Sequence, residues 1–319
     1  MKGIEELITY IDPHKELLIQ AHDFPDHDAV ACAYALGLLL SQRGIANRLC
    51  YGGTIQSNSL DQTIRLLEIP ITAVSDMTIA EGSQLILVDG FAGNRNVTGL
   101  PVRLIGVIDH HEPPDEPTTP YHDIRPEYGA CSTIIQEYYR DVNVEIPRNA
   151  ATMLLMGIMM DTAFMTRGVA PVDLEAFSNL FFRGDWETGS RLLKSSLSLN
   201  DLGVFREAIN SCVVADDFCF VPLQKESTPE VMALVADFFL GLREIHFVVV
   251  VEPDRDAFRL SVRSEDNARP ADVVIRRALA GIGSGGGHVH MGGGSIPLDL
   301  FPGEQSLRNR FLRAMGREL

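Results

Sequence analysis

Short apolar runs alternate with helical patterns through the first half of the chain, and three of the four runs end directly in acidic or histidine residues. The runs lie at 16–22, 46–52, 84–90 and 102–111, and helices are expected at 29–43, 57–67 and 130–140. Continuous apolar runs joined through helices are typical of strands buried on both faces. The pattern therefore predicts an α/β fold with a parallel sheet between Leu17 and Ala170.

The acidic and histidine residues of this half gather where the predicted strands end. They are His22, Asp26 and Asp28 after the first run, Asp89 after the third, and Asp109, His110 and His111 after the fourth. Ligands of open α/β sheets bind at the carboxyl ends of the strands, so these side chains are expected to meet. Asp161 interrupts the apolar stretch 153–165, where burying a lone carboxylate would be costly without a cation or a donor.

Taken one at a time, these residues have simpler explanations. A single aspartate at a strand end is more often a helix N-cap than a metal ligand, and Asp28 stands just before a helical run. A single histidine is usually a hydrogen-bonded surface group. Neither explanation accounts for the whole set, because separate elements all bring carboxylate or imidazole to one edge. Carboxylates with a few imidazoles and no thiolates favour Mn²⁺, with Mg²⁺ or Co²⁺ as alternatives.

The number of candidate ligands predicts two divalent cations. Five aspartates and three histidines are more than one ion can use, and a bridging carboxylate would hold two ions about 3.5–4 Å apart, as in two-metal phosphoesterases. Asp89 stands alone after its strand and is the candidate bridge. His110 and His111 are neighbours on a segment expected to be extended, so their side chains should point in opposite directions. One would bind metal and the other would face substrate.

Size and charge limit the classes of partner. A chain of 319 residues exceeds the size at which one core usually stops growing, so two domains are expected. The formal net charge of −16 argues against long duplex nucleic acid as a partner. No apolar run reaches membrane-spanning length and no signal peptide is recognisable, so we predict a cytoplasmic protein without membrane contact. The five cysteines form no C-x-x-C pair, which argues against disulfides or a cysteine-ligated zinc.

The second half of the chain predicts a smaller α/β unit. Strands are expected at 218–222, 246–252 and 258–263, and helices at 229–240 and 271–280. The glycine-rich segment 281–294 contains a G-x-G-x-x-G match, but a helix precedes it and a strand-like segment follows, which reverses the dinucleotide-binding order. We therefore expect a loop whose backbone N–H groups hold a phosphate and whose end presents His288.

Four motifs taken together resemble the DHH phosphoesterase superfamily. They are the segment 22–29 (HDFPDHDA), Val88-Asp89, Asp109-His110-His111, and the segment 157–161 that ends in an aspartate. The resemblance implies one metal bound by His22, Asp26 and Asp89, and a second bound by Asp28, Asp89, His110 and Asp161. It also implies that Asp109 orients a histidine, that His111 meets the phosphate as a donor or general acid, and that a hydroxide bridging the metals attacks phosphorus.

A second resemblance lies near the C-terminus. Residues 285–288 are similar to the G-G-G-H signature of the DHHA1 domain, and residues 261–264 to its S-x-R-S segment. The implied substrate-binding residues are Arg263, Ser264, Gly285, Gly286, Gly287 and His288, with Arg263 and His288 on the phosphate in an interdomain cleft. The chain is then a catalytic DHH domain (1–188), a linker with a connecting helix (189–211) and a substrate-binding DHHA1 domain (212–319).

Within this superfamily, the length and domain content resemble the nanoRNase/pAp phosphatase group. The implied substrates are short oligonucleotides and 3′-phosphoadenosine 5′-phosphate (pAp). Two other functions stay open: a soluble phosphodiesterase for cyclic or linear dinucleotides, and a non-catalytic nucleotide-binding regulator, which would be expected to lack a ligand. The glycine-rich segment counts against the related inorganic pyrophosphatases, whose C-terminal domain differs. Apolar segments such as 234–242 permit a homodimer without demonstrating one.

Overall fold

The computed structural model describes residues 3–113, 115–194 and 197–317, which divide between two compact units, 1–195 and 196–319. Each unit has its own hydrophobic core. The expected linker 189–211 holds the end of one helix of the first unit and a whole helix of the second, and its residues 195 and 196 lie outside the described residues. In the described part of the chain, every helix is too short or too polar to cross a membrane.

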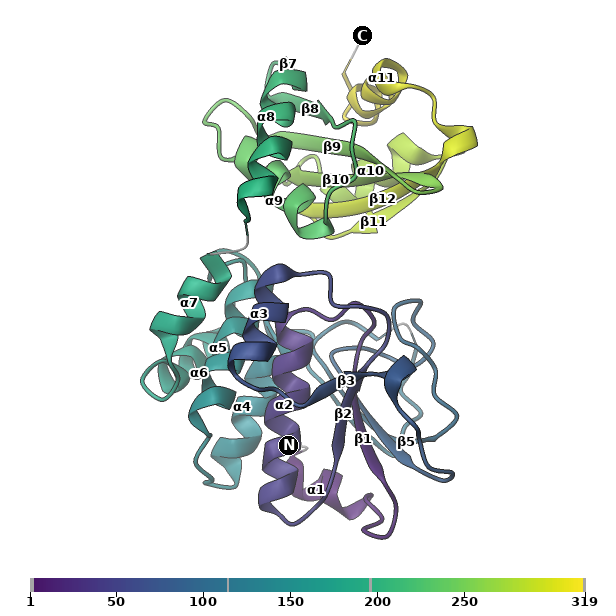
Figure 1. The fold of residues 1–319 in the computed structure, drawn as a ribbon. Coiled ribbons are helices and arrows are strands. Elements are labelled where there is room, and N and C mark those ends of the chain that lie inside the picture. Colours follow the sequence, from purple (N-terminus) through teal and green to yellow (C-terminus); the bar gives the residue numbers. More distant parts are fainter. Residues whose placement is uncertain (1–2, 114, 195–196, 318–319) are drawn as a thin grey trace. The chain divides into compact units, whose positions relative to one another are not determined.

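The first unit is built on a six-stranded sheet in which every pairing is parallel (Figure 1). Its strand order is β3-β2-β1-β4-β5-β6, and the strands are β1 (Leu17–Ala21), β2 (Arg48–Tyr51), β3 (Ile71–Ala73), β4 (Gln84–Val88), β5 (Arg103–Asp109) and β6 (Tyr121–Ile124). The predicted α/β fold with a parallel sheet is therefore confirmed. The sequence pattern did not predict β3 or β6. These strands have only three and four residues, some of them polar, and so are too short to show a periodic pattern.

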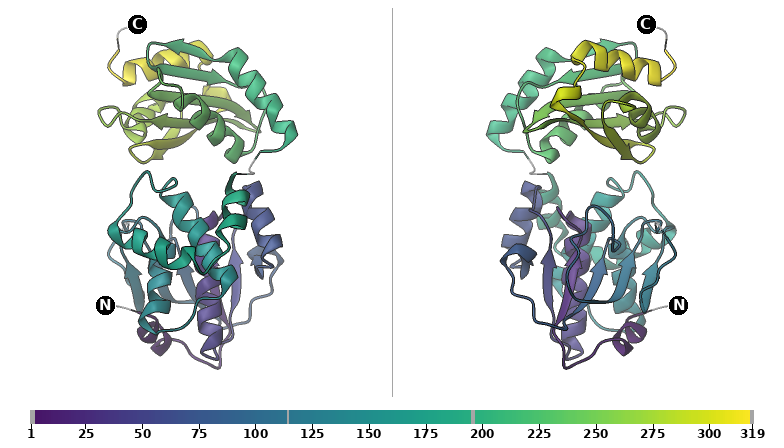
Figure 2. Two further views of the ribbon diagram at one scale, coloured as in Figure 1. Left: turned by 90° about the vertical axis from the view of Figure 1, so that its left-hand side faces the viewer. Right: turned by 90° about the vertical axis from the view of Figure 1, so that its right-hand side faces the viewer.

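Helices cover one face of this sheet, and loops cover the other (Figures 1 and 2). The helices of this unit are α1 (Ile4–Thr9), α2 (His27–Gln42), α3 (Asn58–Leu66), α4 (Cys131–Asp141), α5 (Arg148–Asp161), α6 (Pro171–Phe181) and α7 (Trp186–Lys194), with a 3₁₀ turn, η1 (Val74–Asp76). On the loop face, Leu18, Leu87 and Val107 pack against side chains between β3 and β5. All five residues of β1 and of β4 are buried, as expected for strands covered on both sides.

Helices α2 and α5, which carry Asp28 and Asp161, pack closely against each other. Both helices are apolar around most of their circumference and buried along most of their length. Gly157 of α5 makes the contact close, because a Cβ at this position would lie 2.6 Å from Oδ1 of Asp28, 3.0 Å from its Cα and 2.4 Å from Oγ of Ser132. Only glycine therefore fits between α5 and the first turn of α2.

We predict that Gly157→Ala destabilises the protein by about 1–3 kcal/mol, the usual cost of overpacking a core. The added methyl group meets the backbone of Asp28, so α5 must move away from α2. Urea unfolding would measure the loss. The matched control is Gly203→Ala in a helix of the second unit, where a Cβ meets nothing within 4 Å; we expect this change to be neutral or to stabilise by up to ~1 kcal/mol. Equal effects of the two substitutions would contradict the packing argument.

The second unit contains a mixed six-stranded sheet with the order β11-β12-β10-β9-β8-β7 (Figure 1). Its strands are β7 (Val213–Ala215), β8 (Phe218–Pro222), β9 (Phe247–Asp254), β10 (Ala257–Ser264), β11 (Ser284–Gly287) and β12 (Met291–Pro297). Its helices are α8 (Leu202–Ser211), α9 (Pro229–Leu240), α10 (Ala271–Leu279) and α11 (Glu304–Ala314), with the 3₁₀ turns η2 (Leu199–Asp201) and η3 (Leu298–Leu300). Here α10 and α11 pack on one face of the sheet, and α8 and α9 on the other.

The glycine-rich segment corrects one expectation, because it forms two paired strands and not a loop. Residues 284–287 form β11 and residues 291–297 form β12, with Gly285 opposite Gly294 and Gly287 opposite Gly292. Glycine is usually disfavoured in strands, which is why the sequence predicted a loop. Packing explains why these strands contain glycine, since a Cβ at Gly285 or Gly294 would come within 2.8 Å of Ile275 in α10. The glycines let α10 lie directly on the hairpin.

Candidate metal centre

Residues from five elements converge at the carboxyl edge of the parallel sheet. His22 directly follows β1, Asp89 follows β4, and Asp109 ends β5. Asp26 and Asp28 lie at the start of α2, and Asp161 is the last residue of α5. Their ligand atoms form groups that lie within 4.8 Å of one another: His22, Asp26 and Asp89; Asp28, Asp89, His110 and Asp161; and Asp89, His110 and His111. The sequence-predicted ligands are thus brought together in the first unit.

Asp89 belongs to all three groups within the described residues. Its Oδ2 lies 3.7 Å from Nε2 of His22, and its Oδ1 lies 3.6 Å from Nε2 of His110. The two oxygens of one carboxylate therefore face two different sets of ligands, which is the arrangement of a bridging ligand. The backbone at Asp89 has a φ of 54°, an uncommon left-handed conformation for a residue other than glycine. Such strain is typical of functional sites, and here it turns the side chain at the strand end.

Backbone carbonyls fix the orientation of the two candidate histidine ligands. Nδ1 of His22 lies 2.9 Å from the carbonyl oxygen of Asp23, and Nδ1 of His110 lies 3.1 Å from that of Tyr128. A carbonyl only accepts, so each Nδ1 carries the hydrogen and each Nε2 is turned toward the carboxylates. Histidines that bind metals commonly donate their second ring nitrogen in this way. Both rings are therefore held ready to bind a cation through Nε2.

The orientation of the histidine pair corrects a second expectation. The rings of His110 and His111 do not point in opposite directions, because their centroids are 4.2 Å apart. Alternation applies within a strand, and β5 ends at Asp109, so the two histidines lie in a bend beyond it. Their partners nevertheless differ. Nδ1 of His111 lies 2.9 Å from Oδ1 of Asp109, its side chain is 47% exposed, and Asp109 itself is fully buried.

The electrostatics of this cluster suit divalent cations. Burial and the neighbouring carboxylates raise the pKa of Asp89 and Asp161 well above the usual range, and burial also raises that of Asp28. Burial alone would lower the pKa of the histidines, but the surrounding carboxylates outweigh it and raise that of His22 to about 10 and of His110 to about 11. Oδ1 of Asp89 is buried without a hydrogen-bond partner among the described residues. Cations are the natural compensation for such a cluster.

The start of α2 shows which of its two aspartates is the N-cap, a question that the sequence left open. The N-cap of α2 is Asp26, whose Oδ1 accepts the Ala29 N–H at 3.0 Å, and not Asp28. Asp28 is fully buried and lies against the beginning of α4, where its oxygens accept the backbone N–H groups of Cys131 at 2.7 Å and Ser132 at 2.9 Å. A helix N-terminus stabilises a carboxylate. The packing of α2 on α4 thus fixes the position of Asp28.

The sequence did not reveal how His110 is supported. Tyr128, whose carbonyl holds this ring, is itself held by Arg125, which contacts its hydroxyl at 3.0 Å. Arg125 also forms a two-pronged pair with Asp123 at 2.8 Å and an ion pair with Glu137, and all three charged groups are buried. A main-chain carbonyl gives no signal in a sequence. The alternation of acidic and basic residues from 123 to 125 was the available signal of a paired network.

The predicted substrate-binding residues lie together at one end of the mixed sheet. Arg263 in β10 is opposite Met291 in β12, and the backbone N–H of His288 donates to the Met291 carbonyl at 2.7 Å. His288 is exposed in the turn between β11 and β12. The Arg263 guanidinium pairs with Asp237 at 2.6 Å. Ser264 is buried, and its hydroxyl lies 2.9 Å from the Arg269 carbonyl, which argues against its contact with a substrate.

Most of the ligands at the sheet edge lie in a segment that matches a family model. Residues 16–158 match the model of the DHH family, N-terminal domain. The match ends three residues before Asp161, so the matched segment contains all but one of the candidate ligands. Their assignment as ligands stays a prediction, which the geometry supports.

Relatives resemble the chain over different lengths. An uncharacterized protein of Methanocaldococcus jannaschii is 28% identical over 315 residues, covering 94% of this chain and 64% of that protein. A probable manganese-dependent inorganic pyrophosphatase of Streptococcus thermophilus is 26% identical over 192 residues, covering 58% of this chain and 62% of that protein. The chain therefore spans less than two thirds of the length of these curated relatives.

Solved structures share the fold at low sequence identity. An exopolyphosphatase-related protein from Bacteroides fragilis has a TM-score of 0.73 at 19% identity, covering 95% of this chain and 92% of that one. RecJ from Thermus thermophilus, in complex with Mn²⁺, has a TM-score of 0.57 at 16% identity, covering 98% of this chain and 54% of that one. These likenesses support the two-domain α/β fold.

We predict that Asp89→Asn lowers the affinity for Mn²⁺ by more than the 10–100-fold typical of losing a supporting group beside a ligand. Asparagine keeps the size of the side chain and tolerates the positive φ, so the change removes the charge shared by both ligand sets. Calorimetric titration of chelator-treated protein with Mn²⁺ would measure the affinity.

The matched control is Asp216→Asn, since Asp216 also has a positive φ, 55°, and its side chain is 91% exposed. It should leave Mn²⁺ binding unchanged. If Asp89→Asn bound two Mn²⁺ ions with unchanged affinity, the bridging assignment would be wrong.

Proposed function

We propose that this protein is a divalent-metal-dependent phosphoesterase that hydrolyses short oligonucleotides, pAp, or both. The observation that carries the proposal is the position of Asp89, whose two oxygens face two sets of carboxylate and imidazole ligands. Two adjacent cations are the arrangement that phosphoryl-transfer enzymes use to clamp a phosphate. The match to the DHH domain and the likeness to a manganese-dependent pyrophosphatase support the same class of chemistry.

The residues of the metal centre would have different roles in binding the cations and in proton transfer. His22 and Asp26 would hold one cation, Asp28, His110 and Asp161 the other, and Asp89 both. When bound, the cations, Mn²⁺ in the first place, would polarise the phosphoryl group and activate water. His111 is placed differently, since Asp109 accepts its Nδ1–H and 47% of its side chain is exposed. We assign His111 the proton that the leaving oxygen takes up, and Asp109 the orientation of that ring.

An exposed aromatic ring beside the metal ligands favours a substrate that carries a base. Phe24 lies between His22 and Asp26, with a φ of 54°, and 49% of its surface is exposed. Its backbone N–H donates to the Gly52 carbonyl at 3.2 Å, and its ring covers Gly53, where a Cβ would lie 2.8 Å from a ring carbon. The ring is therefore fixed in place while one side stays accessible. Such rings bind nucleobases by stacking.

Inorganic pyrophosphate is the second candidate substrate. The observation in its favour is the similarity to the curated pyrophosphatase, which is 26% identical over 192 residues. Pyrophosphate has no base, so it gives no role to Phe24. A cyclic or linear dinucleotide would use the ring, and a nucleotide-binding regulator would use it without turnover.

A panel of substrates tests the proposal. Protein loaded with Mn²⁺ would be given a dinucleotide, a five-nucleotide RNA, pAp, a cyclic dinucleotide and pyrophosphate, and products would be separated by chromatography. We expect mononucleotides from the short oligomers or AMP from pAp, and no turnover after chelation. Turnover of pyrophosphate or the cyclic dinucleotide alone would keep the metal centre and refute the substrate assignment. No turnover of any substrate by metal-loaded protein would favour the regulator.

We predict that Phe24→Ala raises the KM for a dinucleotide about tenfold, because base stacking on an aromatic side chain is worth about 1–3 kcal/mol. Steady-state kinetics on the dinucleotide and on an analogue lacking one base would measure the effect. The variant and the parent should differ less on the abasic analogue, and their affinities for Mn²⁺ should agree. Phe182→Ala, which removes a ring that is 86% exposed and outside the metal centre, is the control. A KM unchanged in Phe24→Ala would remove Phe24 from the substrate site.

A further inference from the structure

Asp173 in α6 is a buried carboxylate that is not among the candidate metal ligands, and it accepts three hydrogen bonds. Its Oδ2 accepts the backbone N–H of Gly129 at 2.9 Å and that of Ala170 at 2.7 Å. Its Oδ1 accepts the hydroxyl hydrogen of Thr133 at 2.6 Å. Neither Asp173 nor Thr133 is exposed to solvent. A carboxylate without competing water holds its donors firmly.

Helix capping explains one of these three bonds. Asp173 is the third residue of α6, and an acid at this position commonly accepts the N–H of the residue just before the helix, here Ala170. The other two bonds leave α6 and reach residues 129 and 133, on either side of the start of α4. The capping of α6 therefore explains why an acid stands at position 173, but not why it contacts this segment.

One peptide group connects Asp173 with His110. The carbonyl of Tyr128 and the N–H of Gly129 belong to the same planar, trans peptide group. Its carbonyl accepts Nδ1–H of His110 at 3.1 Å, and its N–H donates to Asp173. Hydrogen bonds arranged in such a chain strengthen one another. Nε2 of His110 lies 3.1 Å from Oδ2 of Asp161. Asp173 therefore fixes the peptide group that turns this ring toward the ligands.

The other end of the same segment holds Asp28. The first two backbone N–H groups of α4 donate to the Asp28 carboxylate, and Thr133, which donates to Asp173, is the next residue of that helix. Asp173 thus contacts the segment 129–133 on both sides of the groups that hold Asp28. A shift of this segment would move the supports of Asp28 and His110 together.

The segment also packs against the residues that follow Asp161. A Cβ at Gly129 would lie 2.7 Å from Oδ2 of Asp173, 2.7 Å from the carbonyl oxygen of Gly168 and 2.9 Å from Cγ2 of Thr162. Thr162 is buried and directly follows Asp161, the last residue of α5. Glycine at position 129 therefore allows the segment to lie against both Asp173 and the end of α5.

The segments that meet at Asp173 bear on one ligand set more directly than on the other. They hold or carry three members of one set: Asp28, His110 and Asp161. In the other set, the ring of His22 is oriented by the carbonyl of its own neighbour, Asp23. The loss of Asp173 should therefore affect the two cations unequally.

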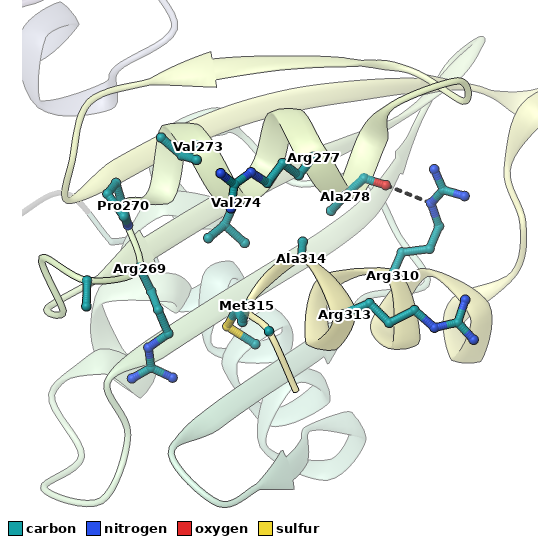
Figure 3. Close-up of a pocket in the computed structure, with 12 residues that line it drawn as sticks. Arg269, Pro270, Val273, Val274, Arg277, Ala278, Arg310, Arg313, Ala314 and Met315 are labelled. Atoms are coloured by element: carbon teal, nitrogen blue, oxygen red, sulfur yellow. Dashed lines mark hydrogen bonds between the residues drawn. The ribbon is translucent and has the colours of Figure 1, made fainter. Parts of the chain in front are cut away.

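A link between two helices of the second unit shows the contrast. Arg310 of α11 donates to the Ala278 carbonyl at the end of α10, at 2.7 Å (Figure 3). Both helices lie outside the metal centre, and this contact joins them without reaching a candidate ligand. Asp173 differs because the groups that it holds are the ones that support ligands.

We propose that Asp173 is a positioning residue of the metal centre, which holds His110 and Asp28, through the segment 129–133, in place to bind one of the two divalent cations. The inference rests on the proposed function as far as the metal centre is concerned, but not on the identity of the substrate. It gives Asp173 no contact with either cation.

Binding of Mn²⁺ to two variants tests the proposal. Asp173→Ala should weaken the binding of one ion about tenfold or more, within the 10–100-fold typical of losing a group that orients a ligand, and leave the other within about twofold. Asp173→Asn should restore most of the affinity, because its amide oxygen can accept both backbone N–H groups and its amide nitrogen can donate to Thr133. Calorimetric titration of chelator-treated protein, without substrate, would measure both ions.

The outcomes separate this inference from the proposed activity. Equal weakening of both ions in Asp173→Ala, or a loss in Asp173→Asn as large as in Asp173→Ala, would overturn the assignment. A parent protein that bound fewer than two Mn²⁺ ions would refute the metal centre, and the inference with it. Two bound ions without turnover of any substrate would refute the activity alone.

A milder pair of variants decides the question if Asp173→Ala does not fold, since that change leaves three buried donors without their acceptor. Thr133→Val removes one donor and keeps the shape of the side chain; we expect about threefold weaker binding of the same ion. The matched control is Thr152→Val, because Thr152 is also buried and its hydroxyl oxygen accepts the Asp185 N–H at 2.8 Å, near the start of α5.

The control should bind both ions as the parent does, and thermal unfolding would verify that both threonine variants are folded. Unchanged binding of both ions in Thr133→Val, or an equal loss in Thr152→Val, would refute the role of Asp173.

Discussion

The first unit is organised around the mutual repulsion of carboxylates held at one edge of a sheet. Two unit charges 4 Å apart interact by about 4 kcal/mol at the effective dielectric constant of a protein surface. Asp28 and Asp89 are almost fully buried, and the raised pKa values of both, and of Asp161, express the cost of keeping their charges together. His22 and His110 compensate part of it. Cations would offset the remaining repulsion. The arrangement of carboxylates that destabilises the fold therefore also favours metal binding.

Such a cluster needs a scaffold that does not relax, and the apolar elements around it provide one. β1 and β4 are buried on both faces, and α2 packs on α5 so closely that only glycine fits at position 157. The start of α4 holds Asp28 through two backbone N–H groups. Behind His110, the network around Arg125 fixes the carbonyl that orients the ring. Asp28 and His110 are thus each held by hydrogen bonds to the main chain of a neighbouring segment.

The sequence predicted the parallel sheet and the convergence of the ligands for one physical reason. Buried parallel strands are continuous apolar runs, and residues that follow them are placed at a common edge. The same reasoning failed where periodicity carries no information. β3 and β6 are too short, the histidine pair lies beyond the end of β5 where alternation no longer applies, and the carbonyl of Tyr128 is main chain. The hairpin of β11 and β12 was missed because glycine there serves the approach of α10, a tertiary cause that outweighs strand propensity.

The charge of the chain bears on the class of substrate. A net charge of −16 repels phosphates in general, but at physiological salt the field of exposed charges is screened beyond about 8 Å. Attraction must then come from groups that touch the ligand. For the proposed substrate these would be the cations held around Asp89. A short anion can be held entirely by such local contacts. A long anion would also meet the negative charge of the rest of the chain, which repels it. Small phosphorylated ligands are therefore favoured.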